Sequence, residues 1–307
     1  MRLTTIYIYA AFILIVICDS KLNAQQLPQY TQYMYNTMSI NPAYAGSNDR
    51  LEASLLHRSQ WVGIDGAPQT QVLTVNGKFF DRVGLGFNIF NDKIGPSSQV
   101  DINVAFSYHL KLNATVNIGL GMNAGMDILS IDWSKGEIYE NEDAIFNENI
   151  NKLRPIIGAG SFIFGEQWYA GISASNFIKS ERYDDQDEVL VERAVHYYLL
   201  GGYVIPITPQ LKLKPAAMVK LTEGAPITID VSSNFLIQEK VTVGVSYRFN
   251  DAVSGLAGFQ ISNTFYLGYA YDYSISDLSK YNSGSHEIIL RYTLHDKKRK
   301  AKSPRFF

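Results

Sequence analysis

The sequence predicts an all-β fold, a transmembrane antiparallel β-barrel of about 14 strands, and three observations support it. The first is a period of two, because almost everything after residue 50 alternates apolar with polar or small side chains. In residues 99–110, the apolar side chains at the even-numbered positions, from Val100 to Leu110, share one face. The side chains at the odd-numbered positions, from Gln99 to His109, share the other. An amphipathic helix would repeat apolar residues at i, i+3 and i+4 instead. These segments are therefore expected to be strands.

The second observation is the number and length of these segments. Most have about 9–11 residues, which is the length that a tilted strand needs to cross a membrane. Their number is even, so the last strand ends on the side where the first one begins. The expected strands cover residues 50–58, 70–79, 83–90, 99–110, 115–126, 153–164, 167–175, 193–204, 211–221, 227–236, 240–249, 254–261, 264–272 and 285–294.

The third observation is an alternation of connection lengths. Even-numbered connections such as Phe80–Arg82 and Gly165-Glu166 are short, whereas odd-numbered ones such as Ser59–Gln69, Asn91–Ser98 and Asp127–Lys152 are longer. Short periplasmic turns and longer outer loops alternate in this way in outer-membrane barrels. Two connections that could have been long are short instead: Thr222–Pro226 and Asn250–Val253.

A soluble β-sandwich is the alternative fold, since its strands also alternate. The 20 Tyr, 16 Phe and 3 Trp residues favour the barrel, because aromatic girdles mark both membrane interfaces. Closure of the sheet also removes its edge strands. Unpaired backbone N–H and C=O groups at such edges would find no water to bond within lipid. Pro215 fits poorly within a strand that has no free edge, and we expect a bulge there.

The first 24 residues are typical of a cleaved signal peptide. Arg2 precedes the apolar run 6–17, and Ala24 offers a small residue for cleavage. The run is too short to span a bilayer. A lipoprotein signal at Cys18, the only cysteine, is the alternative, but Val16-Ile17 precede it instead of a small residue. Cleavage after Ala24 leaves a mature protein without cysteine.

Charge is nearly balanced over the chain but unevenly placed. The 27 basic and 29 acidic residues argue against nucleic acid as a partner. Residues 132–152 and 179–193 are acidic, whereas the tail 296–307 is basic. A 14-strand lumen is too wide for wall side chains alone to fill, so water, the N-terminal segment or long loops must occupy it. The charges expected to face this lumen are Glu52, Arg58, Asp101, Lys212, Lys214, Lys220, Asp230, Arg248, Glu287 and Arg291.

No motif for catalysis or metal binding is present, so we expect no enzyme, no cofactor and no metal site. There is no GxSxG and no HExxH, and the five histidines are scattered. A hidden lipid-hydrolysing Ser–His pair that includes His109 is one alternative. Calcium at the acidic run 184–188 is another, although an acidic run in an outer loop is more often only solvated.

Residues 25–49 form a tyrosine-rich segment before the first strand, and we expect it on the periplasmic side. Tyr30, Tyr33, Tyr35 and Tyr44 have apolar bodies and polar tips that suit half-buried packing. Asn41-Pro42 fixes an extended or turned backbone. Two interpretations remain open. The segment plugs or clasps the barrel, or it forms part of a docking surface for a periplasmic or translocating partner.

The same region carries a family resemblance. Residues 25–79, with QYMYN, NPAYAG, Arg58 followed by QWVG, and GAPQT in order, resemble the start of the PorP/SprF family of type IX secretion system membrane proteins. Leu27 departs from the acidic residue of many relatives. The resemblance extends in outline over the whole chain, and its specific part is residues 25–79. The expected organisation is a signal peptide at 1–24, the N-terminal segment at 25–49, a barrel at 50–295 and a basic tail at 296–307.

The resemblance implies a non-enzymatic outer-membrane protein that supports protein secretion or gliding motility. Its partners would be outer-membrane lipid and either a large secreted adhesin or periplasmic secretion subunits, with no nucleic acid and no small-molecule substrate. A passive channel for small solutes is the alternative. The candidate partner-binding or plug residues are Tyr30, Tyr33, Met34, Tyr35, Asn41, Pro42, Tyr44, Gly46, Arg58, Trp61 and Gly63, and those of the tail are Lys297, Lys298, Arg299, Lys300, Lys302 and Arg305.

Overall fold

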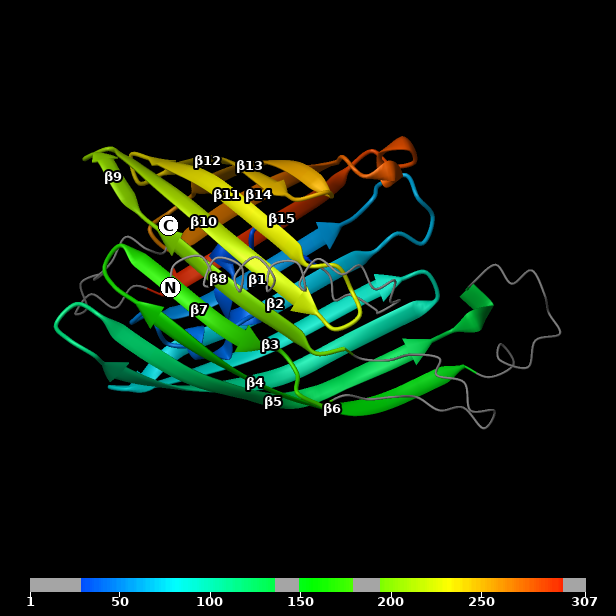
Figure 1. Cartoon of the computed structure of the whole chain (residues 1–307), viewed down its shortest axis with the longest axis horizontal. Helices are drawn as coiled ribbons and strands as arrows, with labels where there is room; N and C mark the ends of the chain where they lie inside the picture. Colours follow the sequence, from blue (N-terminus) through cyan, green and yellow to red (C-terminus); the bar gives the residue numbers. More distant parts are fainter. Residues whose placement is uncertain (1–28, 136–148, 179–193, 295–307) are drawn as a thin grey trace, which may run out of the picture.

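The chain forms a closed antiparallel β-barrel with tilted strands (Figure 1). The structure is a computed structural model and describes residues 29–135, 149–178 and 194–294. The signal peptide, the acidic run 184–188 and the basic tail lie outside the described residues. β1 pairs with both β2 and β15, which closes the sheet and confirms the predicted fold class.

The wall is built from fifteen strand segments, of which β8 and β9 together make one wall strand. β8 pairs with the second half of β10 and β9 with its start, so 14 strands surround the lumen. The segments are β1 (Leu51–Ser59), β2 (Gln69–Phe80), β3 (Val83–Ile94), β4 (Ser97–Lys111), β5 (Asn117–Ile131), β6 (Ile150–Phe164), β7 (Trp168–Ala174), β8 (His196–Tyr203), β9 (Ile205–Thr208), β10 (Leu211–Thr222), β11 (Thr228–Ile237), β12 (Val241–Arg248), β13 (Ala252–Gln260), β14 (Phe265–Ser274) and β15 (Ser285–Leu294).

The two ends of the barrel differ, as the alternating connections predict. One end, called the turn end below, carries the short connections, such as Asp81-Arg82 between β2 and β3. The other, the loop end, carries the longer ones, including residues 60–68 and 275–284. The connection expected at Asn91–Ser98 is only Gly95-Pro96, because β3 and β4 stay paired up to Ile94 and Ser97. Gly95 adopts φ 53°, which a tight turn of this kind requires.

Apolar side chains cover the outside of the barrel and polar ones line its inside. In β4, Val104 is 58% and Phe106 50% exposed, whereas Ser107 is fully buried. This arrangement is the reverse of a soluble core and is what a wall between lipid and a polar lumen requires. All ten charges predicted to face the lumen are buried except Lys212, which is half-buried and pairs with Glu239.

Pro155 and Pro215 are tolerated within their strands because the strands beside them are interrupted. Opposite Pro215 of β10, the adjoining wall strand breaks at Val204 between β8 and β9, and a register shift follows between Leu211 and Lys212. The irregularity expected at Pro215 therefore lies mainly in its neighbour. Pro155 of β6 stands beyond the part of that strand that β7 pairs with, which starts at Ala159. Its missing N–H removes no bond to β7.

The remaining elements of the described residues are short 3₁₀ helices. Three lie in the N-terminal segment: η1 (Tyr33–Tyr35), η2 (Thr37–Ser39) and η3 (Pro42–Tyr44). Two lie at the loop end: η4 (Trp133–Lys135) and η6 (Asp277–Lys280). Within the described ranges, none of the helices is long and apolar enough to cross a membrane.

Candidate functional site

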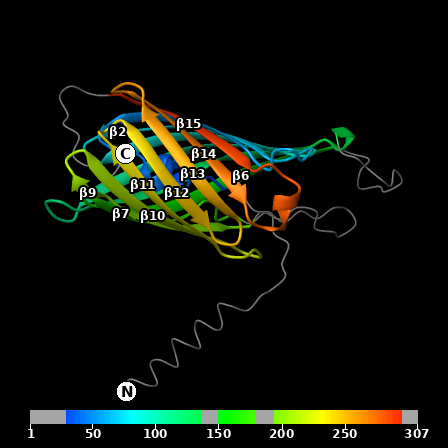
Figure 2. The same cartoon turned by 90° about the horizontal axis from the view of Figure 1, so that it is seen from above.

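Residues 29–47 lie inside the barrel and are called the plug below (Figure 2). The plug begins at the loop end, where Gln29 donates to Asp230 near the start of β11 (2.5 Å). It ends at the turn end, where the Ser107 hydroxyl donates to the Ala45 carbonyl (2.5 Å). The chain then reverses into β1. The segment therefore runs through the lumen rather than beneath the barrel on one side.

Polar side chains of both the plug and the wall hold the plug in place. Asn41 caps η3 by accepting from the Ala43 N–H (3.0 Å), and Pro42 occupies the first helical position, where no N–H is needed. The Asn41 amide also donates to the Ser161 carbonyl of β6 (3.1 Å). The Ser173 hydroxyl of β7 donates to the Ile40 carbonyl (2.6 Å). The last two bonds join the plug to β6 and β7.

Glycines of the wall make room for the plug backbone. A Cβ at Gly84 of β3 would lie 2.0 Å from the Ala45 carbonyl oxygen. One at Gly121 of β5 would lie 2.4 Å from the Ala43 nitrogen. No real Cβ approaches another heavy atom so closely, so a side chain at these positions would displace the plug or the wall. The plug backbone is therefore in close contact with the wall at these glycines.

The plug tyrosines pack against aromatic and basic side chains of the wall. The Tyr35 ring lies 5.4 Å from that of Tyr266 and the Tyr44 ring 5.4 Å from that of Phe162. The Lys214 Nζ lies 5.4 Å from the centroid of the Tyr35 ring, within cation–π distance. These tyrosines are at most 7% exposed. Buried in this way, they are not open to a partner protein.

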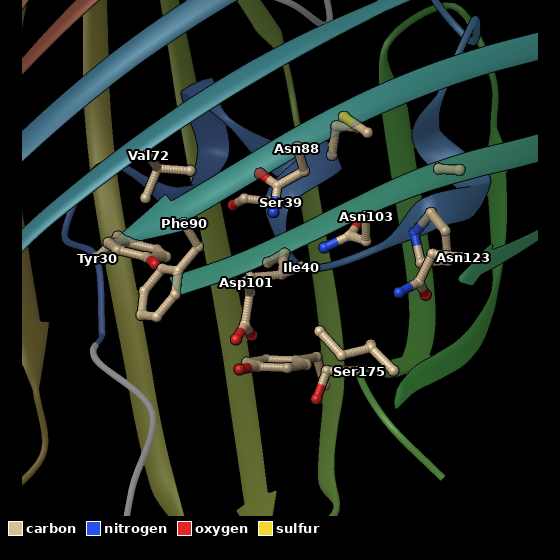
Figure 3. A pocket seen from close by; sticks show the side chains of 15 residues that line it. Tyr30, Ser39, Ile40, Val72, Asn88, Phe90, Asp101, Asn103, Asn123 and Ser175 are labelled. Atoms are coloured by element: carbon tan, nitrogen blue, oxygen red, sulfur yellow. The ribbon is translucent and has the colours of Figure 1, made fainter. Parts of the chain in front are cut away.

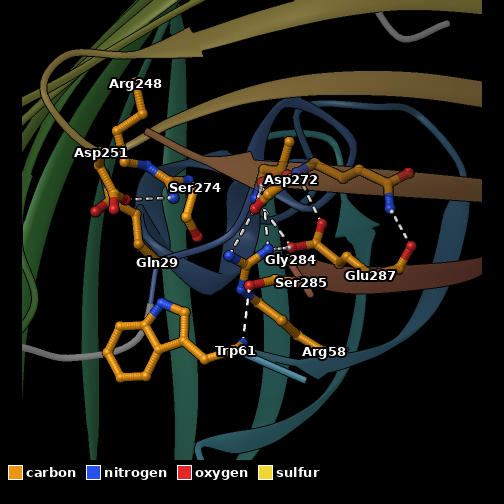
Figure 4. A network of polar contacts seen from close by, with 12 residues as sticks. Gln29, Arg58, Trp61, Arg248, Asp251, Asp272, Ser274, Gly284, Ser285 and Glu287 are labelled. Atoms are coloured by element: carbon orange, nitrogen blue, oxygen red, sulfur yellow. Dashed lines mark hydrogen bonds and ion pairs between the residues drawn. The ribbon is translucent and has the colours of Figure 1, made fainter. Parts of the chain in front are cut away.

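A cluster of buried charges, called the clamp below, fixes the start of the plug (Figure 4). Arg58 of β1 pairs with Asp272 of β14 (2.6 Å) and with Glu287 of β15 (3.1 Å). The Glu287 carboxylate also accepts from the backbone N–H groups of Thr31 (2.9 Å) and Gln32 (2.8 Å). The Thr31 hydroxyl donates to Asp272 at 2.8 Å. Charge-assisted bonds therefore join the plug to the three strands around the closure of the barrel.

A second pair of charges supports the clamp at the same end. Arg248 of β12 contacts Asp230 (2.9 Å) and Asp251 (3.1 Å), and Asp230 accepts the Gln29 amide. Arg248 and Asp230 are both buried. The first residues of the plug are thus bonded to β11 on one side and to β14 and β15 on the other.

The middle of the barrel holds the plug and, beside it, a small cavity. A cavity of about 70 Å³ lies between Ser39 and Ile40 of the plug and a polar strip of wall formed by Asn88, Asp101 and Asn123 (Figure 3). It has room for a few water molecules. Among the residues that the structure describes, the plug occupies this part of the lumen, so a solute would have to move the plug in order to pass.

A wider cavity of about 570 Å³ opens at the turn end. Asp49, Lys78, Arg82, Lys111 and Glu166 line it, so both signs of charge are present. Lys78 pairs with Asp49 at 2.9 Å. The hydrogen bond to Tyr108, together with Asp81, raises the pKa of the Arg82 guanidinium, which therefore stays charged. Charged side chains are thus prominent in the lining of this opening, which also includes Phe164.

The pair formed by Ser107 and His109 serves the plug. Their side chains lie 2.9 Å apart, both are buried on the lumen side, and both contact the Ala45 carbonyl. The pair is therefore covered by the plug and does not face lipid, as a lipid hydrolase would require. Within the described ranges, no group of three or more His, Cys, Asp or Glu side chains is placed to hold a metal ion.

The structure separates the predicted site residues into three groups. Those from Tyr30 to Gly46 form the plug, and Arg58 belongs to the clamp. Trp61 and Gly63 lie in the β1–β2 connection, where the Trp61 N–H donates to Ser285 (3.1 Å). The basic tail lies outside the described residues. Sequence reasoning missed Thr31, Gln32 and Asp272, although the period of β14 already places Asp272 on the lumen face.

The fold and its filled lumen define the class of protein, a plugged outer-membrane β-barrel. The family model for "Type IX secretion system membrane protein PorP/SprF" matches residues 22–292. The chain belongs to this family, as its N-terminal motifs predict. Membership implies an outer-membrane component of type IX secretion, and family and fold together point to a structural or transport role.

Other comparisons add similarity of fold only. No curated protein matches the chain. The "CymD monoaromatic hydrocarbon channel" has 11% identity and TM-score 0.49 over 84% of this chain and 91% of its own. A Pseudomonas aeruginosa FadL homologue has 11% identity and TM-score 0.48, covering 89% and 95%. The "KdgM porin" has 12% identity and TM-score 0.37, covering 80% and 99%. At these values the likenesses say nothing of what the chain does.

Proposed function

We propose that this protein is a non-enzymatic component of type IX secretion that engages another protein rather than conducting solutes. Its partner would be a secreted surface adhesin or a periplasmic subunit of the secretion machinery, and the engagement would support secretion or surface attachment. The observation that carries this proposal is the plug, which is bonded at both ends and packed against wall glycines. Family membership supplies the secretion context.

The partner surface is best sought at the two ends of the barrel. The plug tyrosines, which the sequence offered as docking residues, are buried. At the loop end, Tyr281 is 72% exposed and Leu278 39%. At the turn end, Leu112 is 55% exposed beside the charged cavity. The wall between the two ends faces lipid, so protein contacts there are not required by the proposal.

Site-specific photocross-linking in the native host tests the proposal. A photoreactive residue is placed at Tyr281 for the loop end, at Leu112 for the turn end, and at Val245 as a lipid-facing control in the middle of β12. We expect an adduct at one end, identified by mass spectrometry as an adhesin or a secretion subunit, and none at Val245. The absence of such an adduct at both ends, with normal amounts of the barrel, would refute engagement.

Conductance separates the proposal from the passive-channel alternative. Purified full-length protein in a planar bilayer is expected to be silent, because the plug is buried inside the lumen and is bonded to the wall at both ends. Steady ion conductance in the wild type would favour the channel. Removal of the tail 296–307 is a further arm, and we expect it to weaken capture at the turn end, as added salt would.

A further inference from the structure

The direction of the plug has a topological consequence at its first residue. The clamp residues Arg58, Asp272 and Glu287 all lie near the loop ends of β1, β14 and β15. Thr31 and Gln32 bind this clamp, and Gln29 binds Asp230 at the loop end of β11. The chain therefore enters the lumen from the loop end.

The opposite end of the plug fixes this direction independently. Ala43 and Ala45 contact wall glycines of β3 and β5 close to the turn end. Asp49, the next charged residue, pairs with Lys78 near the end of β2. β1 then starts at Leu51, at the turn end, and runs back to the loop end. The plug and β1 are thus antiparallel to each other.

We infer that the N-terminus of the mature chain opens on the loop-end face of the barrel, which is the cell surface, whereas its C-terminal tail leaves at the turn end. Outer-membrane barrels place their longer loops outside the cell and their short turns in the periplasm. β15 ends at Leu294, opposite Leu51, at the turn end. The two termini of one chain then lie on opposite sides of the outer membrane.

Chain length leaves no room for the N-terminus to return to the periplasmic side. Gln26 is three positions before Gln29, and an extended chain of that length spans about 10 Å. The nine residues of β1 cover about 30 Å between the two ends. With the signal peptide cleaved after Ala24, Gln26 stays near the loop end. This placement reverses the periplasmic position that the sequence suggested for the start of the segment.

Cysteine labelling on intact cells tests the inference. Three single-cysteine variants, Gln26→Cys, Tyr281→Cys and Arg82→Cys, are treated with a membrane-impermeant maleimide before and after opening of the outer membrane. Tyr281 is exposed at the loop end and Arg82 at the turn end. The mass of each variant shows that residues 1–24, with Cys18, are gone, and heat-modified migration on gels shows a folded barrel.

We expect Gln26→Cys to react on intact cells as Tyr281→Cys does, and Arg82→Cys to react only once the membrane is opened. Labelling of Gln26→Cys only together with Arg82→Cys would overturn the inference. So would labelling of Arg82→Cys, but not Tyr281→Cys, on intact cells, because the loop end would then face inward. If the maleimide does not reach a cysteine at position 26 on either side, a variant with Gly-Ser-Gly-Cys inserted after Ala24 tests the same location with a more accessible thiol.

Discussion

We expect replacement of Arg58 by methionine to lower the free energy of unfolding of the barrel more than any other single substitution in the clamp. The side chain keeps its length but loses its charge, so Asp272 and Glu287 remain buried without their shared cation. Arg58 is 1% exposed, and water cannot take its place without rearrangement. Breaking a buried ion pair by removal of one partner costs about 3–5 kcal/mol. The ratio of folded to unfolded protein would fall by about two to four orders of magnitude.

The assay is guanidinium unfolding of the protein in lipid vesicles, followed by tryptophan fluorescence. Arg82→Met is the matched control, because this arginine is exposed and its guanidinium makes a long hydrogen bond (3.5 Å) to the Tyr108 hydroxyl. We expect its unfolding midpoint to equal that of the wild type. Arg58→Met should lower the midpoint without changing the slope.

A double-mutant cycle with Glu287→Gln examines the physical reason. The glutamine can still accept an N–H of the plug, but it carries no charge that needs a cation. The double variant should therefore be less destabilised than the two single changes predict in sum, by about 0.5–3 kcal/mol. An Arg58→Met variant as stable as the wild type, or strict additivity in the cycle, would refute the view that paired charge holds the clamp.

The remaining predictions concern the glycines, the lipid face and the plug as a barrier. Gly84→Val should destabilise the barrel by about 1–3 kcal/mol or more, because a Cβ there meets the Ala45 carbonyl. Gly255→Val is the control and should not, because the space around its Cβ is open. Equal unfolding midpoints in the two variants would contradict close packing of the plug against the wall. Val245→Arg should cost about 2–4 kcal/mol of folding free energy in vesicles, because Val245 is 62% exposed on the outer face. Val245→Leu, the control, should cost almost nothing. If the arginine variant were as stable as the wild type, this face would not contact lipid. Gly121→Leu, which pushes on Ala43, should raise bilayer conductance above that of the silent wild type; a silent variant that is fully folded would count against the plug as the barrier.

Much of the wall follows from the sequence because the period of two is a local signal. Side chains that alternate between lipid and lumen identify each strand, and turn residues such as Asp81-Arg82 mark its end. The exceptions have physical causes. The expected loop around Gly95-Pro96 is shortened because pairing between β3 and β4 continues beyond the apolar pattern. The break at Val204 belongs to the neighbour of Pro215, and a single strand does not reveal its neighbour's irregularities.

The plug shows where sequence reasoning stops. Its tyrosines and Asn41-Pro42 indicate a fixed, half-buried segment, but nothing in residues 29–47 alternates or repeats in a way that fixes its direction. Its partners, Asp272 and Glu287, lie more than 200 residues away in the chain. Contacts at such separation arise from closure of the barrel. They become visible only when β1 is placed beside β15.

Because the plug is continuous with β1, the order of assembly is constrained. The residues ahead of the plug must already lie on the loop-end side when the last strand pairs with the first, because a closed barrel leaves no path for them afterwards. A large prefolded domain attached ahead of Gln25 would then remain on the turn-end side and would prevent the last strand from pairing with the first. The same domain attached after the last residue would leave assembly undisturbed.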